Sequence, residues 1–238
     1  MGEPVAAVTL PRRLRGGRWL RPLGLGLWGA VLLQSGISGR LDLLLRAVFH
    51  PLVWISGVVL VVAALLELVG GGGVTPTPRQ RTVLLLGVVV AIGVLLVPPR
   101  PSFADLAANR GRELLDEPGL NFVVPPGQRT LTEWVRLLRS EPDPKLHAGD
   151  PVRISGFVLP VPGDRPQLAR LLVRCCLVDA TPVGLPVLWL PGRPLPQADQ
   201  WLELRGVMDT ERLDGQTRSV IRAQAVRVIP RPARPLEP

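Results

Sequence analysis

The sequence predicts an α-helical membrane region of three transmembrane helices, followed by a mainly β C-terminal domain of five strands. Three observations support this. The mean hydropathy is +0.28 despite a formal net charge of +9. Three stretches before Pro99 contain no Asp, Glu, Lys or Arg, and short runs after residue 150 alternate apolar and polar residues. An apolar content of 47% excludes a disordered chain, and two cysteines that are neighbours exclude a disulfide-built scaffold.

The three uncharged stretches define the membrane region, residues 22–99. A spanning helix needs about 20 apolar residues, and the predicted spans are about 22–38, 47–69 and 82–98. The second span meets this requirement easily, with Trp54 near one end as an interfacial aromatic residue. The third is short, because a helix over 83–97 rises only about 22 Å. A buried helix of a soluble domain is therefore the alternative for that stretch.

Arginine placement predicts the orientation in the membrane. Residues 1–21 form a basic N-terminus with five arginines, at positions 12, 13, 15, 18 and 21, and such flanks stay in the cytoplasm. Three spans then leave residues 100–238 on the exoplasmic side, whereas two spans would leave them in the cytoplasm. We therefore expect a multi-pass plasma-membrane protein. A signal peptide is the competing interpretation, but no A-x-A-like cleavage site follows the first apolar stretch.

Polar residues inside or beside the spans are candidate functional positions. Ser35 and Gly36 lie near the end of the first span, where small residues allow close helix packing. His50 precedes Pro51 at the start of the second span. Polar groups in a membrane are often functional, while the simpler interpretation is that these residues pack helices or face the interface.

The C-terminal half has the charge density of a soluble domain. Residues 100–149 form a Pro-rich linker with a short helix candidate at 103–115 and an amphipathic helix at about 130–140, where Thr130 and Glu133 are spaced as a capping box. Period-two alternation predicts five strands within residues 150–230, at 152–158, 168–178, 183–190, 201–208 and 219–229. Their pattern resembles an OB-like barrel, and residues 231–238 form a Pro/Arg-rich tail.

A nucleic-acid-binding barrel is a further alternative that the composition disfavours. Such barrels need a basic groove with stacked aromatic residues. Residues 145–230 have a net charge of only +3, and their aromatic residues are Phe157, Trp189 and Trp201. We expect neither a nucleic-acid partner nor a cofactor. Because no nucleophile–base triad, phosphate-binding loop or carboxylate pair is recognisable, we also expect a protein that is not an enzyme.

Cys175 and Cys176 are the most unusual local feature of the C-terminal half. If both lie in the second strand, their side chains point to opposite faces of the sheet, so they do not ligate one metal ion. The C-x-x-C spacing of zinc and redox motifs is absent as well, and no metal site is predicted. The simpler interpretation is that one thiol is a small core residue and the other faces the surface. The functional alternative is a redox-sensitive thiol or a contact to a partner. Asp179 is predicted to cap the tight turn before Pro182.

The chain resembles the bacterial YcgQ-type family of permease-subunit membrane proteins, which have three N-terminal spans and a C-terminal domain with a Cys-x-x-Asp motif. Matching segments are 33–36 (LQSG), 50–51 (HP), 98–101 (PPRP), 106–111 (LAANRG), 152–158 (VRISGFV) and 175–180 (CCLVDA). The cysteine segment is the most specific, and Cys176 and Asp179 are the positions that the resemblance carries over. Some members have a histidine-rich loop that suggests metal handling, but residues 70–81 contain no histidine here.

The resemblance implies a function as a non-catalytic accessory subunit of a permease or transport complex in the bacterial inner membrane, with a polytopic, permease-like partner. The residues themselves leave a second hypothesis open, a membrane-tethered thiol, redox or ligand-binding protein that uses Cys176. A membrane-tethered nucleic-acid-binding barrel is the third and requires a cytoplasmic C-terminal domain.

Overall fold

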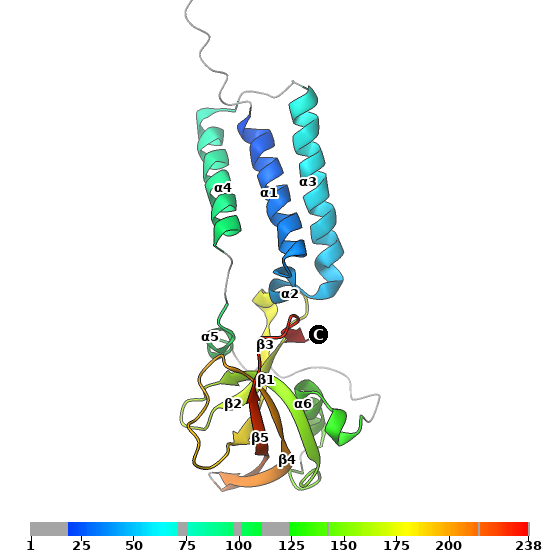
Figure 1. Cartoon of the computed structure of the whole chain (residues 1–238), viewed down its shortest axis with the longest axis vertical. Helices are drawn as coiled ribbons and strands as arrows, with labels where there is room; N and C mark the ends of the chain where they lie inside the picture. Colours follow the sequence, from blue (N-terminus) through cyan, green and yellow to red (C-terminus); the bar gives the residue numbers. More distant parts are fainter. Residues whose placement is uncertain are drawn as a thin grey trace, which may run out of the picture. The chain divides into compact units, whose positions relative to one another are not determined.

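A computed structural model describes residues 19–70, 76–97, 101–110, 124–141, 143–213 and 215–237 (Figure 1). The chain divides into two compact units. The helical unit comprises residues 1–40 and 48–99, and the barrel unit comprises residues 41–47 and 100–238. The arginines predicted to orient the N-terminus, at positions 12, 13, 15 and 18, lie outside the described residues.

The helical unit contains three long helices, α1 (Leu20–Ile37), α3 (His50–Gly70) and α4 (Pro78–Leu96). A 3₁₀ turn, η1 (Ala47–Phe49), precedes α3. Within the described residues, two helices are long and apolar enough to cross a membrane, namely η1 with α3 and α4. The prediction of apolar helices of spanning length is therefore confirmed for the second and third stretches. The first stretch is helical, but Arg21 and Gln34 make it more polar.

The start of α4 differs from the prediction for a local reason. The helix begins at Pro78, four residues before the predicted span, and ends at Leu96. Thr77 and Gln80 form a reciprocal capping box, in which the Thr77 hydroxyl accepts from the Gln80 N–H and the Gln80 amide oxygen accepts from the Thr77 N–H. With Pro78 in the first turn, these contacts satisfy the first donors of the helix. The absence of charged residues indicates the apolar part of α4, whereas the capping box determines where the helix begins.

Close approach of two glycines holds α1 against α3. A Cβ added to Gly29 would lie 2.7 Å from Val61 Cγ2 and 2.9 Å from the Gly57 carbonyl oxygen. At one end of this pair Arg21 forms a 3.1 Å ion pair with Glu67, and at the other end Gly36 lies directly against the Trp54 ring. The order of these contacts makes the two helices antiparallel over their full length. Close backbone contact of this kind stabilises helix pairs through van der Waals packing.

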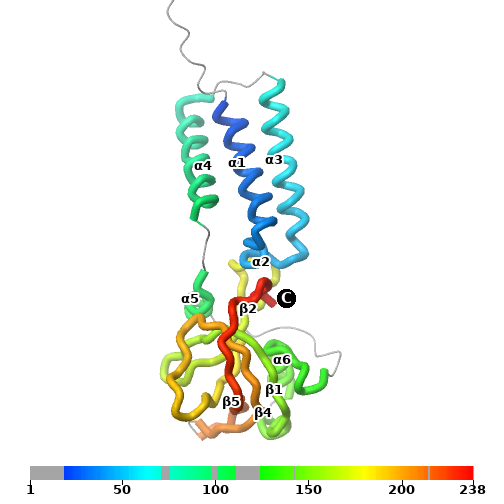
Figure 2. Tube along the Cα trace, in the orientation of Figure 1, coloured from blue at the N-terminus to red at the C-terminus, as the bar shows by residue number. Residues whose placement is uncertain are grey.

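The barrel unit contains a closed five-stranded β-barrel, as the period-two pattern predicted. Its strands are β1 (Pro151–Leu159), β2 (Gln167–Leu172), β3 (Thr181–Leu188), β4 (Trp201–Leu213) and β5 (Gln216–Val228). The order β1–β4–β5–β3–β2 closes because β1 also pairs with β2, and β3–β5 is the parallel pair among these five strands. Figure 2 traces the chain through β1, β4 and β5 of this barrel. The unit also contains α2 (Leu41–Leu44), α5 (Phe103–Ala108), η2 (Pro126–Gln128) and α6 (Leu131–Ser140).

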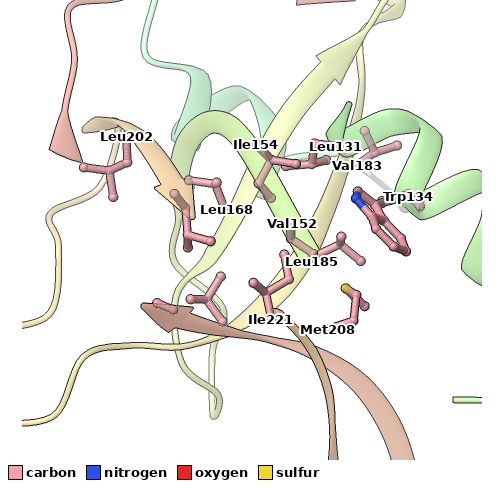
Figure 3. Close-up of a cluster of buried hydrophobic side chains, with 14 of the residues drawn as sticks. Leu131, Trp134, Val152, Ile154, Leu168, Val183, Leu185, Leu202, Met208 and Ile221 are labelled. Atoms are coloured by element: carbon pink, nitrogen blue, oxygen red, sulfur yellow. The ribbon is translucent and has the colours of Figure 1, made fainter. Parts of the chain in front are cut away.

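Two apolar clusters fill and flank the barrel. The larger cluster is closed at one end by α6, whose Leu131 and Trp134 pack on the inward faces of the strands (Figure 3). The second cluster joins α5 to the barrel through Phe103, Phe157 and Trp201. The helix candidate at 103–115 is present as far as Ala108, and its part from residue 111 onward lies outside the described residues.

The predicted tail at 231–238 contains a short strand instead. Residues Leu236–Glu237 form β6, which pairs in parallel with Leu171 and Leu172 of β2. Its anchor is Arg170, which is almost fully buried, donates to the Ser155 carbonyl at 2.8 Å and lies 3.3 Å from the Glu237 carboxylate. A buried guanidinium needs such partners. The Pro- and Arg-rich composition of residues 231–238 therefore gave no indication that two of them pair with β2.

Candidate functional site

Cys175 and Cys176 lie outside the strand in which the sequence analysis located them. The second strand, predicted at 168–178, ends at Leu172, where its pairing with Thr181 of β3 ends. Residues 174 and 175 form a bend, Cys176 is a bridge residue, and the 3₁₀ turn η3 (Leu177–Asp179) follows. The prediction that the two thiols point to opposite faces is wrong, since their sulfur atoms are 3.5 Å apart. Without a ladder to fix alternation, neighbouring side chains turn to one side.

The Asp179 carboxylate determines the shape of this bend. Its Oδ1 accepts the backbone N–H of Arg174 at 3.0 Å, and its Oδ2 accepts those of Cys175 at 2.8 Å and Cys176 at 3.4 Å. The sequence predicted that Asp179 caps the turn before Pro182. It caps the preceding turn instead, because three converging amides offer a carboxylate more hydrogen bonds than the following turn does.

A segment distant in sequence forms the other side of the site. Leu45 and Cys176 form an isolated antiparallel bridge, and the backbone N–H of Arg46 donates to the Cys175 carbonyl oxygen at 3.0 Å. Asp42 in the same segment pairs with Arg234 at 3.6 Å. Residues 41–47, which connect the first two predicted spans, are thus part of the barrel unit. No periodicity or motif in the sequence signals this pairing.

The electrostatics of the site favour protonated Cys175. The Asp179 carboxylate, followed by the Cys176 thiol, raises the pKa of Cys175 to about 12. Partial burial acts to raise the pKa of Asp179, but hydrogen bonds from Cys175, Arg174 and Cys176 outweigh it and lower that pKa. Cys175, which is exposed, is therefore a thiol at neutral pH and not an activated thiolate nucleophile.

The same three side chains form a possible ligand set. Within the described part of the chain, Cys175, Cys176 and Asp179 are the group whose sulfur and oxygen atoms all lie within 4.8 Å of one another. No metal ligands were predicted, because in a strand the two thiols would point to opposite faces. In the structure these residues lie outside the strand, and Cys176 and Asp179, the two positions carried over from the family resemblance, lie close together.

The other candidate residues belong to the helical unit. Ser35 donates its hydroxyl to the Val31 carbonyl oxygen at 2.7 Å, which satisfies the side chain within its own helix. Gly36 is the contact point for Trp54, and His50 is the first residue of α3. Helix packing therefore accounts for Gly36.

A groove between the helices of the helical unit has no counterpart among the sequence-based predictions. Its volume is about 910 Å³, and it is mainly apolar with basic residues among those that line it. Gly24 and Gly87 have no side chain to fill the groove. A Cβ added to Gly24 would approach Leu84, and one added to Gly87 would approach the Trp28 ring. The wall also includes Arg21, Arg79 and Gln80. The glycines within these apolar helices were the feature of the sequence that could have indicated the groove.

Comparison of this chain with family models, with curated proteins and with solved structures finds no significant match.

Proposed function

We propose that this chain is a multi-pass protein of the bacterial inner membrane with three spans and an OB-like exoplasmic barrel, and that it acts as a non-catalytic accessory subunit of a permease complex. The observation that carries the proposal is the apolar exterior of α3 and α4. Large side chains such as Leu66 of α3 and Leu86 of α4 are more than 60% exposed. An exposed apolar surface of this extent requires lipid or a protein partner.

The packing of α1 supports the third span. Contacts between α1 and α3 run from Arg21–Glu67 to Gly36–Trp54, so α1 accompanies α3 over most of its length. Its 18 residues rise about 27 Å, close to the hydrocarbon thickness of a bilayer. If α3 crosses the membrane, a helix packed along it in this register crosses as well.

The pairing of residues 41–47 with the barrel supports its exoplasmic location. Leu45 and Cys176 form a bridge within one folded unit, so the segment after α1 and the domain after α4 share one side of the membrane. The N-terminal arginines occupy the other side if α1 spans, and that side is the cytoplasm by the positive-inside rule. Three spans and an exoplasmic barrel satisfy both conditions.

The groove of the helical unit supports a partner within the membrane. Small residues at helix interfaces allow a further helix to approach closely, and the groove has Gly24 and Gly87 in its wall. A polytopic, permease-like protein offers such helices. The transported substrate is not specified by any of these residues.

Single cysteines test the orientation, because a Cys175→Ser, Cys176→Ser variant of this chain contains no other cysteine. In that background Leu146→Cys, on the exposed surface of the barrel unit, should be labelled by a membrane-impermeant maleimide in intact spheroplasts, and the cysteine-free parent should not be labelled. As a matched control, Val69→Cys, near the end of α3 opposite to His50, should be labelled only after lysis. Labelling of Val69→Cys but not of Leu146→Cys in intact spheroplasts would reverse the proposed orientation.

The partner is tested by purification from the native membrane in mild detergent. A tagged chain should co-purify with a polytopic membrane protein in a fixed ratio. Gly87→Leu, which fills the groove, should reduce this recovery, whereas Gly93→Leu should not, because a Cβ at Gly93 meets no atom within 4 Å. Recovery of the wild-type chain as a lone monomer contradicts the accessory-subunit function.

A second candidate function, a membrane-tethered thiol or ligand-binding protein, is favoured by the 3.5 Å separation of the two sulfur atoms. Thiol–disulfide exchange with oxidised glutathione would join them in a disulfide between adjacent residues and release two molecules of reduced glutathione. If a Cys176→Ser variant supports the same cellular phenotype as the wild-type chain, the thiol or ligand-binding function is excluded.

A further inference from the structure

The cysteine bend has the geometry of a chelating site. Two thiolate sulfurs bound to a tetrahedral zinc ion, each about 2.3 Å from it, lie about 3.8 Å apart. The Cys175 and Cys176 sulfurs are 3.5 Å apart, which corresponds to a sulfur–metal–sulfur angle of about 100° with bonds of that length. Such an angle suits a tetrahedral ion and not the linear coordination of two thiolates.

The third ligand is already oriented toward the pair. A carboxylate has about four lone pairs, and Asp179 uses three of them for the backbone N–H groups of residues 174–176. The fourth accepts the hydrogen bond of the Cys175 thiol and is freed when a cation displaces that proton. The Asp179 carboxylate lies within 4.8 Å of both sulfurs. Because Asp179 also holds the backbone that carries the two cysteines, the three ligands form one rigid turn.

We infer that Cys175, Cys176 and Asp179 bind a thiophilic divalent cation of the zinc class. Two sulfur ligands select such ions over Mg²⁺ and Ca²⁺, which prefer oxygen. Three protein ligands leave a fourth position for water or for a ligand from another molecule. The exposure of Cys175 makes that position reachable from solvent. The arrangement suits an exchangeable ion rather than a closed structural one.

The backbone pairing of residues 45 and 46 completes the site. Arg46 donates its N–H to the Cys175 carbonyl oxygen, which fixes the peptide that carries the first thiol. Two thiolates and one carboxylate exceed the charge of a divalent ion by one negative charge. The backbone N–H groups of Arg174 and Arg46 both donate to this bend, so two arginines are attached to the backbone that carries the ligands.

This inference rests on the second candidate function, a ligand-binding thiol pair, and not on the permease partner. The test uses the full chain, reduced, without a histidine tag and in detergent, titrated with Zn²⁺ against a chromophoric chelator. We expect one ion per chain, and Co²⁺ should give a sulfur-to-cobalt charge-transfer band. Cys175→Ser and Cys176→Ser should each lower the Zn²⁺ affinity at least tenfold and remove or weaken the band.

Two further variants separate binding from folding. Asp179→Asn should lower the affinity and shift the band, while Asp164→Asn, a carboxylate bound to Arg218 elsewhere on the barrel, should leave both unchanged. If Asp179→Asn loses the fold, the two serine variants still decide the question. Zinc binding that persists in the cysteine-free variant, or Co²⁺ binding without a thiolate band, overturns the metal site.

The outcomes distinguish this inference from the function on which it rests. A reduced chain that binds no Zn²⁺ but forms a Cys175–Cys176 disulfide with oxidised glutathione, with release of two molecules of reduced glutathione, retains the thiol function and loses the metal site. A chain whose thiols do neither loses both. Co-purification of a membrane partner is independent of either result.

Discussion

Replacing Phe103 by Ala tests how much the packing of α5 against the barrel contributes to the unfolding free energy of the barrel unit. Phe103 lies in α5 and is only 1% exposed. Its ring makes edge-type contacts with Phe157 at 5.7 Å and Trp201 at 6.0 Å between centroids, and the Arg231 guanidinium lies 4.8 Å above its face. The backbone N–H of Ala104 also donates to Asp199 at 2.6 Å.

The expected cost follows from burial and from ring geometry. Truncation of a buried Phe to Ala costs about 3 to 5 kcal/mol, and each aromatic pair contributes about 0.5 to 1.5 kcal/mol within such totals. We expect the Phe103→Ala barrel to lose about 3 to 5 kcal/mol of unfolding free energy. Since about 1.4 kcal/mol corresponds to a factor of ten, its fully open state becomes roughly a hundredfold to several thousandfold more populated.

Hydrogen–deuterium exchange of the full chain in detergent measures this change. Peptides from β1 and β4 that exchange only by global opening should lose protection by that factor, whereas peptides from α3 should be unchanged. Leu146→Ala is the matched control, because Leu146 is 60% exposed and its truncation should alter exchange less than threefold. Exchange in β1 and β4 within threefold of wild type for Phe103→Ala would refute the reasoning.

The remaining predictions concern helix packing and pH. Gly29→Val should disrupt the α1–α3 contact and lower the thermal stability of the helical unit by several degrees, while Gly93→Val, which meets open space, should shift the melting temperature by less than 2 °C (about 0.5 kcal/mol). The Arg218 guanidinium lowers the pKa of Asp164, and that of Glu211 as well. A lowered folded-state pKa means that the stabilisation is complete above the unfolded value, near pH 4, and is lost as pH falls through the folded value. Asp164→Asn should therefore cost on the order of 1 kcal/mol at pH 7 in chemical denaturation, and the difference from wild type should shrink as pH falls through the lowered folded-state pKa of Asp164. A difference that does not shrink at any pH below the unfolded value of about 4 at which the protein stays folded contradicts this assignment.

Local patterns were sufficient to predict much of the fold. The absence of charge over two long stretches predicted the apolar helices α3 and α4, and alternation predicted the five barrel strands. Thr130 and Glu133 mark the start of α6 through a capping box visible in the sequence. Each of these features depends on neighbours within one turn or one strand.

The candidate site was only partly predictable. The sequence singled out Cys175, Cys176 and Asp179, but strand periodicity gave the wrong relation between the two thiols. The strand ends at Leu172 because its partner strand ends there, and pairing between strands is a tertiary property. The groove of the helical unit was likewise hidden, since it depends on which helices pack together.

Hydropathy and residue period, which act over a few residues, were enough to locate the apolar helices and the strands and to single out the residues with unusual chemistry. Tertiary contacts were needed to show that the two thiols converge, that Asp179 caps the bend they share, and that residues 41–47 pair with it. This bend is held by hydrogen bonds to a carboxylate and to a segment about 130 residues earlier in the chain. Because such bonds lie outside any local repeat, they leave no periodic trace in the sequence.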